Sequence, residues 1–418
     1  MGTWIRYIKR MRSIEIRNIG PVISVKIDLN RFNVFIGRQS SGKSTIAKMV
    51  SNCTWMEKEI ATHPFNPIRN YESSYIEELV GFHNMEGYIT KDSYLRYDSD
   101  YLTIVMEKQR CVITKKAAMD DYKRKKVLYI PSERNMVVYT DSIGGANNLR
   151  SFAADWQSAR DIFDEGNKQK ILDLGVRYYK TGENGKTINH VASLSKERPY
   201  DINLKSGSSG LQSVIPITTT IDFFTGHFYD PNIQDKLMKS NDMYDVRHLV
   251  EYFVKARHIK NAEEGKEEIV RMMDDVMGLV NTVSTSFVIE EPENNLFPET
   301  QYSLVNFIVN CMNRNNRHHE ATITTHSPYV LSTLNILLLA GKLVKHEEFT
   351  PMVGKIAGET FIDASELSVW NVSNGKVMPI MDKTTQMISE NYLDTVSDVL
   401  AGKFNELYKL YVKSLRKG

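Results

Sequence analysis

Apolar and polar residues alternate along the first part of the chain. Residues 13–36 contain three such runs, SIEIRNI, VISVKIDL and FNVFIG, and a Gly20-Pro21 turn separates the first two. Alternation with a period of two, bounded by turn residues, predicts β-strands. Residues 86–130 repeat the pattern in YLTIVMEK and RCVITKKA, which predict a hairpin leading into the strand VLYIP.

Other stretches carry apolar residues at helical spacing. They predict helices at residues 44–60, 151–174 and 299–313, and a short, densely charged helical hairpin at residues 235–281. The last such stretch, residues 384–416, predicts an amphipathic C-terminal helix with apolar positions at Leu393, Val396, Leu400, Leu407 and Tyr411. Residues 181–207, rich in Gly, Asn, Ser and Lys, predict a loop. Asn374-Gly375 predicts a tight turn between the strands VWNV and KVMPI.

Composition narrows the class of protein without choosing a function. The 418 residues are 41% hydrophobic and 25% charged, which fits one globular unit with a large core and two or three lobes. The net charge of +2 favours neither a nucleic-acid partner nor its absence. Three widely spaced cysteines argue for a reducing compartment and against zinc. No apolar run is long enough to span a bilayer, and the basic start lacks a signal-peptide core, so we expect a cytoplasmic protein without a membrane partner.

The sequence GRQSSGKS, from Gly37 to Ser44, matches the phosphate-binding pattern G-x-x-x-x-G-K-[ST]. In this pattern backbone N–H groups surround phosphate oxygens, the lysine neutralises the β and γ phosphates, and the serine hydroxyl binds Mg²⁺. A chance match is the alternative, but the motif lies between a predicted strand and a predicted helix, as such a loop must. The candidate nucleotide-binding residues are Gly37, Ser40, Ser41, Gly42, Lys43, Ser44 and Thr45.

A second motif, FVIEEPENN from Phe287 to Asn295, ends an apolar strand in paired carboxylates. Nucleotide hydrolysis needs one carboxylate in the Mg²⁺ shell and another to orient the attacking water. Neighbouring strand residues point to opposite sides, so Glu290 and Glu291 can take different roles. A solvated acidic loop is the alternative for this motif alone.

Two further features gain meaning from their order along the chain. The tract SGSSGLQS, Ser206 to Ser213, offers small residues and the Ser209 hydroxyl at a helix start, where the helix dipole favours a phosphate. In ITTHSPYVL, His326 ends a strand and can contact a γ-phosphate. The alternative for the Ser/Gly tract is a flexible linker. The alternative for His326 is a structural histidine. Their succession, phosphate loop, Ser/Gly tract, EEPE strand and TTHS strand, indicates one nucleotide site divided between two chains.

With these motifs the chain resembles the SMC-like and OLD-like branch of ABC ATPases. IEIRNIGPVISVKIDLNRFNVFIG is similar to the strands that lead into the phosphate loop in that branch, and EEPENNLFP, TTHSPYVLS and YIPSERN resemble further segments of it. The resemblance implies an α/β ABC-type ATPase head, a mixed sheet with a parallel core, an antiparallel β lobe and a helical insertion, binding ATP and Mg²⁺. It also implies roles for single residues: Lys43 and Ser44 bind nucleotide and Mg²⁺, Glu290 supports Mg²⁺, Glu291 is the catalytic carboxylate, His326 is the switch, Ser209 and Gly210 are the signature, and Arg17 and Asn18 approach the adenosine.

Three features depart from the family pattern. Glu290 stands where an Asp is usual, although Glu-Glu-Pro-Glu occurs in the OLD-like and defence-ATPase branch. Gln109 and the segment YIPSERN compete as the Q-loop. The 80-residue separation of Gly210 from Glu290 leaves room for the predicted insertion at 235–281. The chain has no long heptad arms and is therefore no complete SMC rod.

The resemblance favours an ATPase that senses or regulates, with its effector on a separate chain. Stand-alone ATPases of this kind, such as the PARIS and Septu ATPase components, serve in anti-phage defence and imply a nuclease or toxin partner. An SMC-like DNA clamp for repair or chromosome maintenance is one alternative. An ATP-gated nuclease is another, but no Asp-x-Asp pair follows Glu291. We expect a homodimer around ATP, with DNA as a possible partner. The run Lys123–Lys126 has two interpretations, a contact with phosphates and a solvated face, and the solvated face is the commoner. The pair His318-His319 is expected to lie in a solvated loop.

Overall fold

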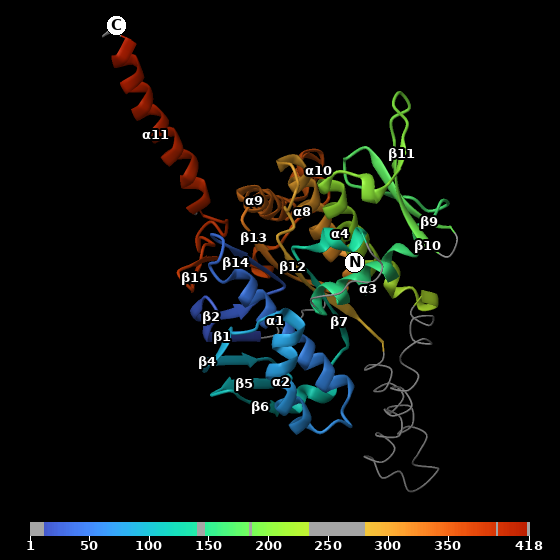
Figure 1. Ribbon diagram of the computed structural model, residues 1–418, viewed down its shortest axis with the longest axis vertical. Coiled ribbons are helices and arrows are strands. Elements are labelled where there is room, and N and C mark those ends of the chain that lie inside the picture. The colour runs from blue at the N-terminus through green and yellow to red at the C-terminus, as the bar shows by residue number, and fades with distance from the viewer. Residues whose placement is uncertain (1–11, 140–146, 184–185, 234–280, 390–391, 416–418) are drawn as a thin grey trace.

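The computed structural model describes residues 12–139, 147–183, 186–233, 281–389 and 392–415 (Figure 1). Its centre is an eleven-stranded sheet with the order β6-β5-β4-β1-β2-β15-β14-β3-β13-β12-β7. A separate four-stranded sheet has the order β11-β10-β9-β8. The predicted α/β class, with a mixed sheet and an antiparallel β lobe, is confirmed.

One half of the large sheet is parallel. Strands β7, β12, β13, β3 and β14 run in the same direction, and β3 and β12 are buried along their whole length. Parallel strands covered on both faces become nearly continuous apolar runs, as FNVFI does here. Their bounds are β3 Phe32–Ile36, β7 Lys125–Ile130, β12 Ser284–Glu290, β13 Glu320–Thr325 and β14 Leu367–Ser373.

The other half of the sheet is antiparallel, except that β15 pairs with β2 in parallel. The predicted hairpin is present as β5 and β6, and the two strands predicted on either side of Gly20-Pro21 pair as β1 and β2. The predicted Asn374-Gly375 turn joins β14 to β15 with positive φ at both residues (50° and 67°), as a tight hairpin turn requires. The strands are β1 Arg12–Ile19, β2 Val22–Leu29, β4 Ile89–Asp98, β5 Leu102–Glu107, β6 Arg110–Lys115 and β15 Lys376–Pro379.

Helices cover both faces of the large sheet and form two apolar cores. One core joins α1 and α2 to the antiparallel strands, and the other joins α3, α4, α8 and α9 to the parallel strands. α1 begins directly after the phosphate loop and also contacts β7, β12 and β13. The helices are α1 Lys43–Thr62, α2 Ile68–His83, α3 Asn147–Arg160, α4 Ser209–Thr225, α8 Pro298–Met312, α9 Pro328–Leu343, α10 Thr350–Ala357 and α11 Tyr392–Leu415.

The loop prediction for residues 181–207 is wrong. This region lies mostly in the small sheet, where Val191 pairs with Tyr178 and both side chains are fully buried. The buried side chains on one face of this sheet stabilise strands in a segment whose composition alone favours turns. The helix predicted at 151–174 also ends early, at Arg160, because a turn at Asp164 follows, in which its carboxylate accepts from the Gly166 N–H. The small-sheet strands are β8 Gln169–Lys170, β9 Val176–Glu183, β10 Lys186–Ser193 and β11 Asp201–Asn203.

Two predicted helical segments differ in their outcome. The insertion predicted at 235–281 lies, except for residue 281, outside the described residues. The C-terminal helix is present but begins at Tyr392 rather than 384, because Asp382 accepts hydrogen bonds from the Thr384 and Thr385 N–H groups in a turn. Figure 1 shows α11 extending away from the rest of the chain. Among the described helices, none is long and apolar enough to cross a membrane.

Candidate functional site

The phosphate loop spans residues 37–42, between the end of β3 and the start of α1, as predicted. Its glycines are needed for different reasons. Gly42 has φ 108°, a conformation that side chains rarely adopt. A Cβ at Gly37 would lie 2.2 Å from the Val372 carbonyl oxygen. Ser40 also takes positive φ (59°), and the Ser41 hydroxyl is buried without a partner in the described chain.

Lys43 points back into this loop. Its ammonium donates to the carbonyl oxygens of Gly37 (2.9 Å) and Arg38 (2.8 Å) and lies 3.3 Å from Nδ1 of His326. Burial lowers the pKa of Lys43 to about 8, while the carboxylates of Glu291, Glu293 and Glu290 oppose that change. The cation is therefore partly desolvated and held where a phosphate oxygen can replace the two carbonyl groups.

The ends of β12 and β13 bring Glu291 and His326 together, although they are 35 residues apart in the sequence. Nε2 of His326 lies 2.7 Å from Oε1 of Glu291, and its Nδ1 lies 3.0 Å from the Gly37 carbonyl oxygen. The hydrogen bond with His326 lowers the pKa of Glu291, which is thus ionised at neutral pH. Glu291 has positive φ (43°), which turns the chain sharply where β12 ends. The predicted acidic motif and the predicted histidine thus belong to one cluster with the phosphate loop.

Glu290 differs from Glu291 in its surroundings. It is 5% exposed, and its Oε1 has no hydrogen-bond partner in the described part of the chain. Burial raises its pKa, and the hydroxyls of Tyr129 and Ser44 and the charge of Lys48 oppose this. A buried carboxylate oxygen without a partner, beside a serine hydroxyl, fits the oxygen ligands that Mg²⁺ prefers. Glu290 and Ser44 therefore fit the predicted metal site. The neighbouring Thr45 is buried in the first turn of α1.

Two residues of the cluster were missed in the sequence. Glu293 accepts hydrogen bonds from the Thr325 hydroxyl (2.7 Å) and the His326 backbone N–H (2.6 Å), so it fixes the end of β13 against the EEPE segment. Arg134 is fully buried and donates to the carbonyl oxygens of Glu290 (3.0 Å) and Glu291 (2.9 Å). Both residues stand in motifs that the sequence analysis singled out, Glu293 in EEPE and Arg134 in YIPSERN. Neither motif indicates which groups these two side chains contact.

The Ser/Gly tract begins α4, as predicted, with Ser208 as its cap and Ser209 as its first residue. Gly210 packs closely on the acidic loop: a Cβ there would lie 3.0 Å from the Asn295 carbonyl oxygen. Arg134 also donates to the Ser213 carbonyl oxygen (3.3 Å) and so joins the start of α4 to the carboxylates. Within the part of the chain that the structure describes, Ser209 makes no hydrogen bond with the phosphate loop of its own chain.

The remaining candidates, Arg17 and Asn18, lie on β1 in the antiparallel half of the large sheet. The Arg17 guanidinium stacks 3.9 Å from the Tyr94 ring, and the Asn18 side chain donates to the Asp92 carbonyl oxygen. Their adenosine role stays a prediction. Gln109 lies in the turn between β5 and β6, at the far end of the sheet from Arg134, so only YIPSERN of the two Q-loop candidates reaches the cluster.

The expectation of a solvated pair at 318–319 is wrong for His319. It is fully buried, and its Nδ1 accepts from the Thr285 N–H at 3.1 Å. Burial lowers its pKa to about 4. The residue is a structural contact between β12 and the start of β13. Within the described residues, no cluster of His, Cys, Asp and Glu has the arrangement of a protein-only metal site, and the three cysteines are free and buried.

No protein-family model matches the chain, and no curated protein matches it. Among solved structures, an SMC head bound to the C-winged helix domain of ScpA is 10% identical, covering 90% of this chain and 99% of that chain, with a TM-score of 0.41. The SMC head domain from Thermotoga maritima is 8% identical, covering 89% and 99%, with a TM-score of 0.37. The recombination mediator RecF is 7% identical, covering 90% and 100%, with a TM-score of 0.32. These scores are below 0.5, so the assignment of the site rests on its own geometry.

Proposed function

We propose that this chain binds ATP with Mg²⁺ in the cluster of Lys43, Glu290, Glu291 and His326, and hydrolyses it. The observation that carries the proposal is the convergence of a phosphate loop with two carboxylates and a histidine from the ends of β12 and β13. A phosphate loop alone supports binding, whereas an ionised carboxylate facing it supports hydrolysis.

Binding exchanges partners at Lys43. Its ammonium leaves the Gly37 and Arg38 carbonyl oxygens and takes phosphate oxygens, and the first N–H groups of α1 face the same charge. Ser44 and Glu290 would hold Mg²⁺, which neutralises phosphate charge when it is bound. Arg134 keeps the carboxylate-bearing backbone in place, because it donates to the carbonyl oxygens of Glu290, Glu291 and Pro292.

Hydrolysis requires a positioned water. Glu291 accepts a hydrogen bond from this water, whose oxygen forms a bond to the γ-phosphorus as the bond to the β–γ bridging oxygen breaks. The proton of the water passes by way of the carboxylate to the phosphate product. His326 holds Glu291 in place and contacts the loop carbonyl of Gly37, so it can report the presence of the γ-phosphate to the carboxylate.

The test replaces Glu291. Glu291→Gln keeps the size of the side chain but loses its charge, and we expect ATP binding to persist while turnover falls by about a thousandfold. Glu299→Gln, the same change at an exposed position in α8, is the control and should keep the wild-type rate. Wild-type turnover in purified Glu291→Gln would show that this carboxylate does not orient the water.

A second part of the proposal is that two chains share each ATP. The supporting observation is that the α4 start, with Ser209 and Gly210, packs on the acidic loop of its own chain and leaves its N-terminal end for a phosphate from elsewhere. Lys43→Ala and Ser209→Arg chains, each inactive alone, should recover activity when mixed, because each mixed dimer contains one intact composite site. No recovery at any ratio of folded, associating mutants contradicts the shared site.

The third part is that the ATPase regulates an effector on another chain, in the manner of the anti-phage defence ATPases that the motifs resemble. Its support is the exposed apolar face of α11, with Leu400, Phe404, Leu407 and Tyr411 between 58% and 67% exposed. Purification from the native operon tests it: a nuclease or toxin retained by wild-type chain and lost with Leu407→Glu supports the proposal. A kleisin-like or repair partner favours the DNA clamp. Cleavage of DNA by this chain alone contradicts a separate effector.

A further inference from the structure

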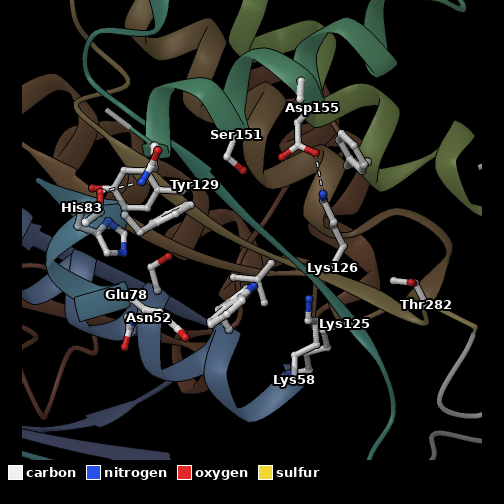
Figure 2. Close-up of a pocket in the computed structure, with 18 of the residues that line it drawn as sticks. Asn52, Lys58, Glu78, His83, Lys125, Lys126, Tyr129, Ser151, Asp155 and Thr282 are labelled. Carbon is white, nitrogen blue, oxygen red and sulfur yellow. Dashed lines mark hydrogen bonds and ion pairs between the residues drawn. The ribbon is translucent and has the colours of Figure 1, made fainter. Parts of the chain in front are cut away.

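Helices α1, α2 and α3 and strand β7 border a cavity of about 1010 Å³ (Figure 2). Two lysines of β7 line it, and both already have acidic partners. Lys126 lies 2.6 Å from Asp155, as Figure 2 shows, and Lys125 lies 2.5 Å from Glu320. The solvated-face interpretation of Lys123–Lys126 is therefore wrong for Lys125, which is 6% exposed. These charges are matched within the chain, whereas a more reactive group of side chains lies on the small sheet.

One face of the small sheet carries a hydroxyl, an imidazole and a carboxylate in contact. Thr181 lies on β9, His190 on β10 and Asp201 on β11. Oγ1 of Thr181 lies 2.9 Å from Nε2 of His190, and Nδ1 of His190 lies 3.2 Å from Oδ1 of Asp201. A hydroxyl within hydrogen-bond reach of an imidazole, which a carboxylate orients in turn, is the arrangement that activates a nucleophile in acyl transfer.

Strand pairing brings these three side chains together. His190 pairs with Tyr179 of β9, and Ala192 pairs with Asp201 of β11. Side chains two residues apart along a strand lie on the same side of the sheet. Thr181, His190 and Asp201 therefore share one face, while the other face of the small sheet packs on the core of the parallel half.

The direction of each hydrogen bond follows from the groups that meet. A carboxylate can only accept, so Nδ1 of His190 carries the proton that is donated to Asp201. In a neutral ring Nε2 is then an acceptor, and the Thr181 hydroxyl donates to it. This is the tautomer in which an imidazole can take the proton of the hydroxyl.

Tyr179 holds the imidazole and the carboxylate in place. Its ring stacks on the His190 ring, with centroids 4.7 Å apart and 12° between the planes. Its hydroxyl donates to Oδ2 of Asp201, and this hydrogen bond raises the pKa of Tyr179 to about 12, so the phenol stays a donor at neutral pH. The Lys168 ammonium lies 3.9 Å from the centre of the same ring. The cluster thus has support from side chains that are not themselves part of the relay.

The cluster is partly open to solvent. The side chains of His190 and Asp201 are 23% and 42% exposed, and Thr181 is half-buried, so a substrate can reach the hydroxyl. In such surroundings the charge of a transition state is stabilised less than in an enclosed site. The leaving group must therefore be a good one, which favours an ester or a thioester over an amide.

We propose that Thr181, His190 and Asp201 form a second catalytic site, separate from the ATP site, which hydrolyses an ester or thioester through an acyl-threonine. Oγ1 of Thr181 forms a bond to the carbonyl carbon, and its proton passes to Nε2 of His190. The bond from that carbon to the leaving oxygen or sulfur breaks, and the leaving group takes the proton. Water, deprotonated by the same nitrogen, then releases the carboxylic acid and restores the hydroxyl. Asp201 is a positioning residue, because it keeps the proton on Nδ1.

The first test treats the wild-type full chain with a fluorophosphonate, which reacts with activated hydroxyls, and locates the label by mass spectrometry of peptides. We expect the label on Thr181 and not on Thr187, a half-buried threonine on the opposite face of the same two strands. Lys43→Ala should be labelled at the wild-type rate, because the ATP site takes no part. No label on Thr181, equal labelling of both threonines, or loss of the label in Lys43→Ala overturns the proposal.

The second test follows the hydrolysis of p-nitrophenyl acetate. Thr181→Val keeps the shape of the side chain without its hydroxyl, and His190→Gln removes the base, so each should lower the rate at least about tenfold. Thr187→Val and His346→Gln, the same changes outside the cluster, are the matched controls and should keep the wild-type rate. An unchanged rate in Thr181→Val, or an acetyl group found on His190 in place of Thr181, overturns the assignment.

Asp201→Asn separates a positioning role from a purely structural one. The amide can donate to Nδ1 and so favours the tautomer with the proton on Nε2, which cannot accept from Thr181. We expect kcat for the ester to fall at least about tenfold while KM and the melting temperature change little. A wild-type kcat in this variant would show that Asp201 does not orient the imidazole for catalysis, and would overturn the three-residue relay.

Discussion

The two ends of helix α1 contact two different kinds of site. At its start, Lys43, Glu291 and His326 satisfy one another and the loop carbonyls. Along its second half, Asn52 and the facing His83 are buried with atoms that have no partner among the described residues. Backbone carbonyl oxygens partner the Lys43 ammonium and so offset the burial of its charge. Oδ1 of Asn52 and Nδ1 of His83 have no such partner among the described residues, and a buried polar atom without a partner costs stability.

Removing the cation should have the largest effect. We expect Lys43→Ala to lower ATP affinity by roughly a hundredfold or more, because the ammonium is the principal charge facing the phosphates. The free chain should stay folded, since burial already disfavours this cation. Calorimetry with ATP and a thermal melt measure the two effects. A melting temperature that falls with affinity would show that Lys43 is mainly structural.

Next in size is the loss of Arg134. Arg134→Met should lower the free energy of unfolding by about 3–5 kcal/mol, because it leaves the carbonyl oxygens of Ser213, Glu290, Glu291 and Pro292 without their buried donor. Urea denaturation measures this. Arg17→Met is the control on an exposed arginine, and a similar loss there would contradict a special role for Arg134.

ATP affinity and the stability of the free chain should depend on pH in opposite directions at Lys43. Its pKa of about 8 means that its charge is lost between pH 7 and 9, so ATP affinity should fall by about tenfold over that range. Stability should change in the opposite direction. The unfolded state, with an ordinary pKa of 10.5, binds more protons above pH 8, so this group makes the free chain more stable as pH rises toward 10. Titration of Lys43→Arg, whose charge persists, should flatten the affinity profile.

The smallest effect concerns Asn52 in the second half of α1. Asn52→Leu should raise the free energy of unfolding by about 1 kcal/mol, because a buried oxygen without a partner among the described residues is removed. Thr54→Val in the same helix is the matched control. Its buried hydroxyl donates to the Val50 carbonyl oxygen at 2.8 Å, so its loss should be neutral or mildly destabilising. Destabilisation by Asn52→Leu would show that Asn52 has a partner in solution.

Local motifs determined much of the candidate site. The phosphate loop, the EEPE strand end, the Ser/Gly helix start and the strand-end histidine each depend on neighbouring residues, and each lies in the predicted kind of element. The alternation in residues 13–36 and the Asn374-Gly375 pair also predicted their strands and their turn correctly. They could do so because alternation and turn chemistry depend only on neighbouring residues. Together they fixed the α/β class and the edge of the sheet where the site lies.

The tertiary structure decided what distant segments do to one another. Arg134 could not be assigned because its acceptors are 79 to 158 residues away. Residues 181–207 form strands in spite of their composition because Tyr178 and Val191 are buried together. The cavity likewise exists only where α1, α2, α3 and β7 meet. A side chain's partners, its burial and therefore its pKa depend on the folded neighbourhood, which no local pattern in the sequence contains.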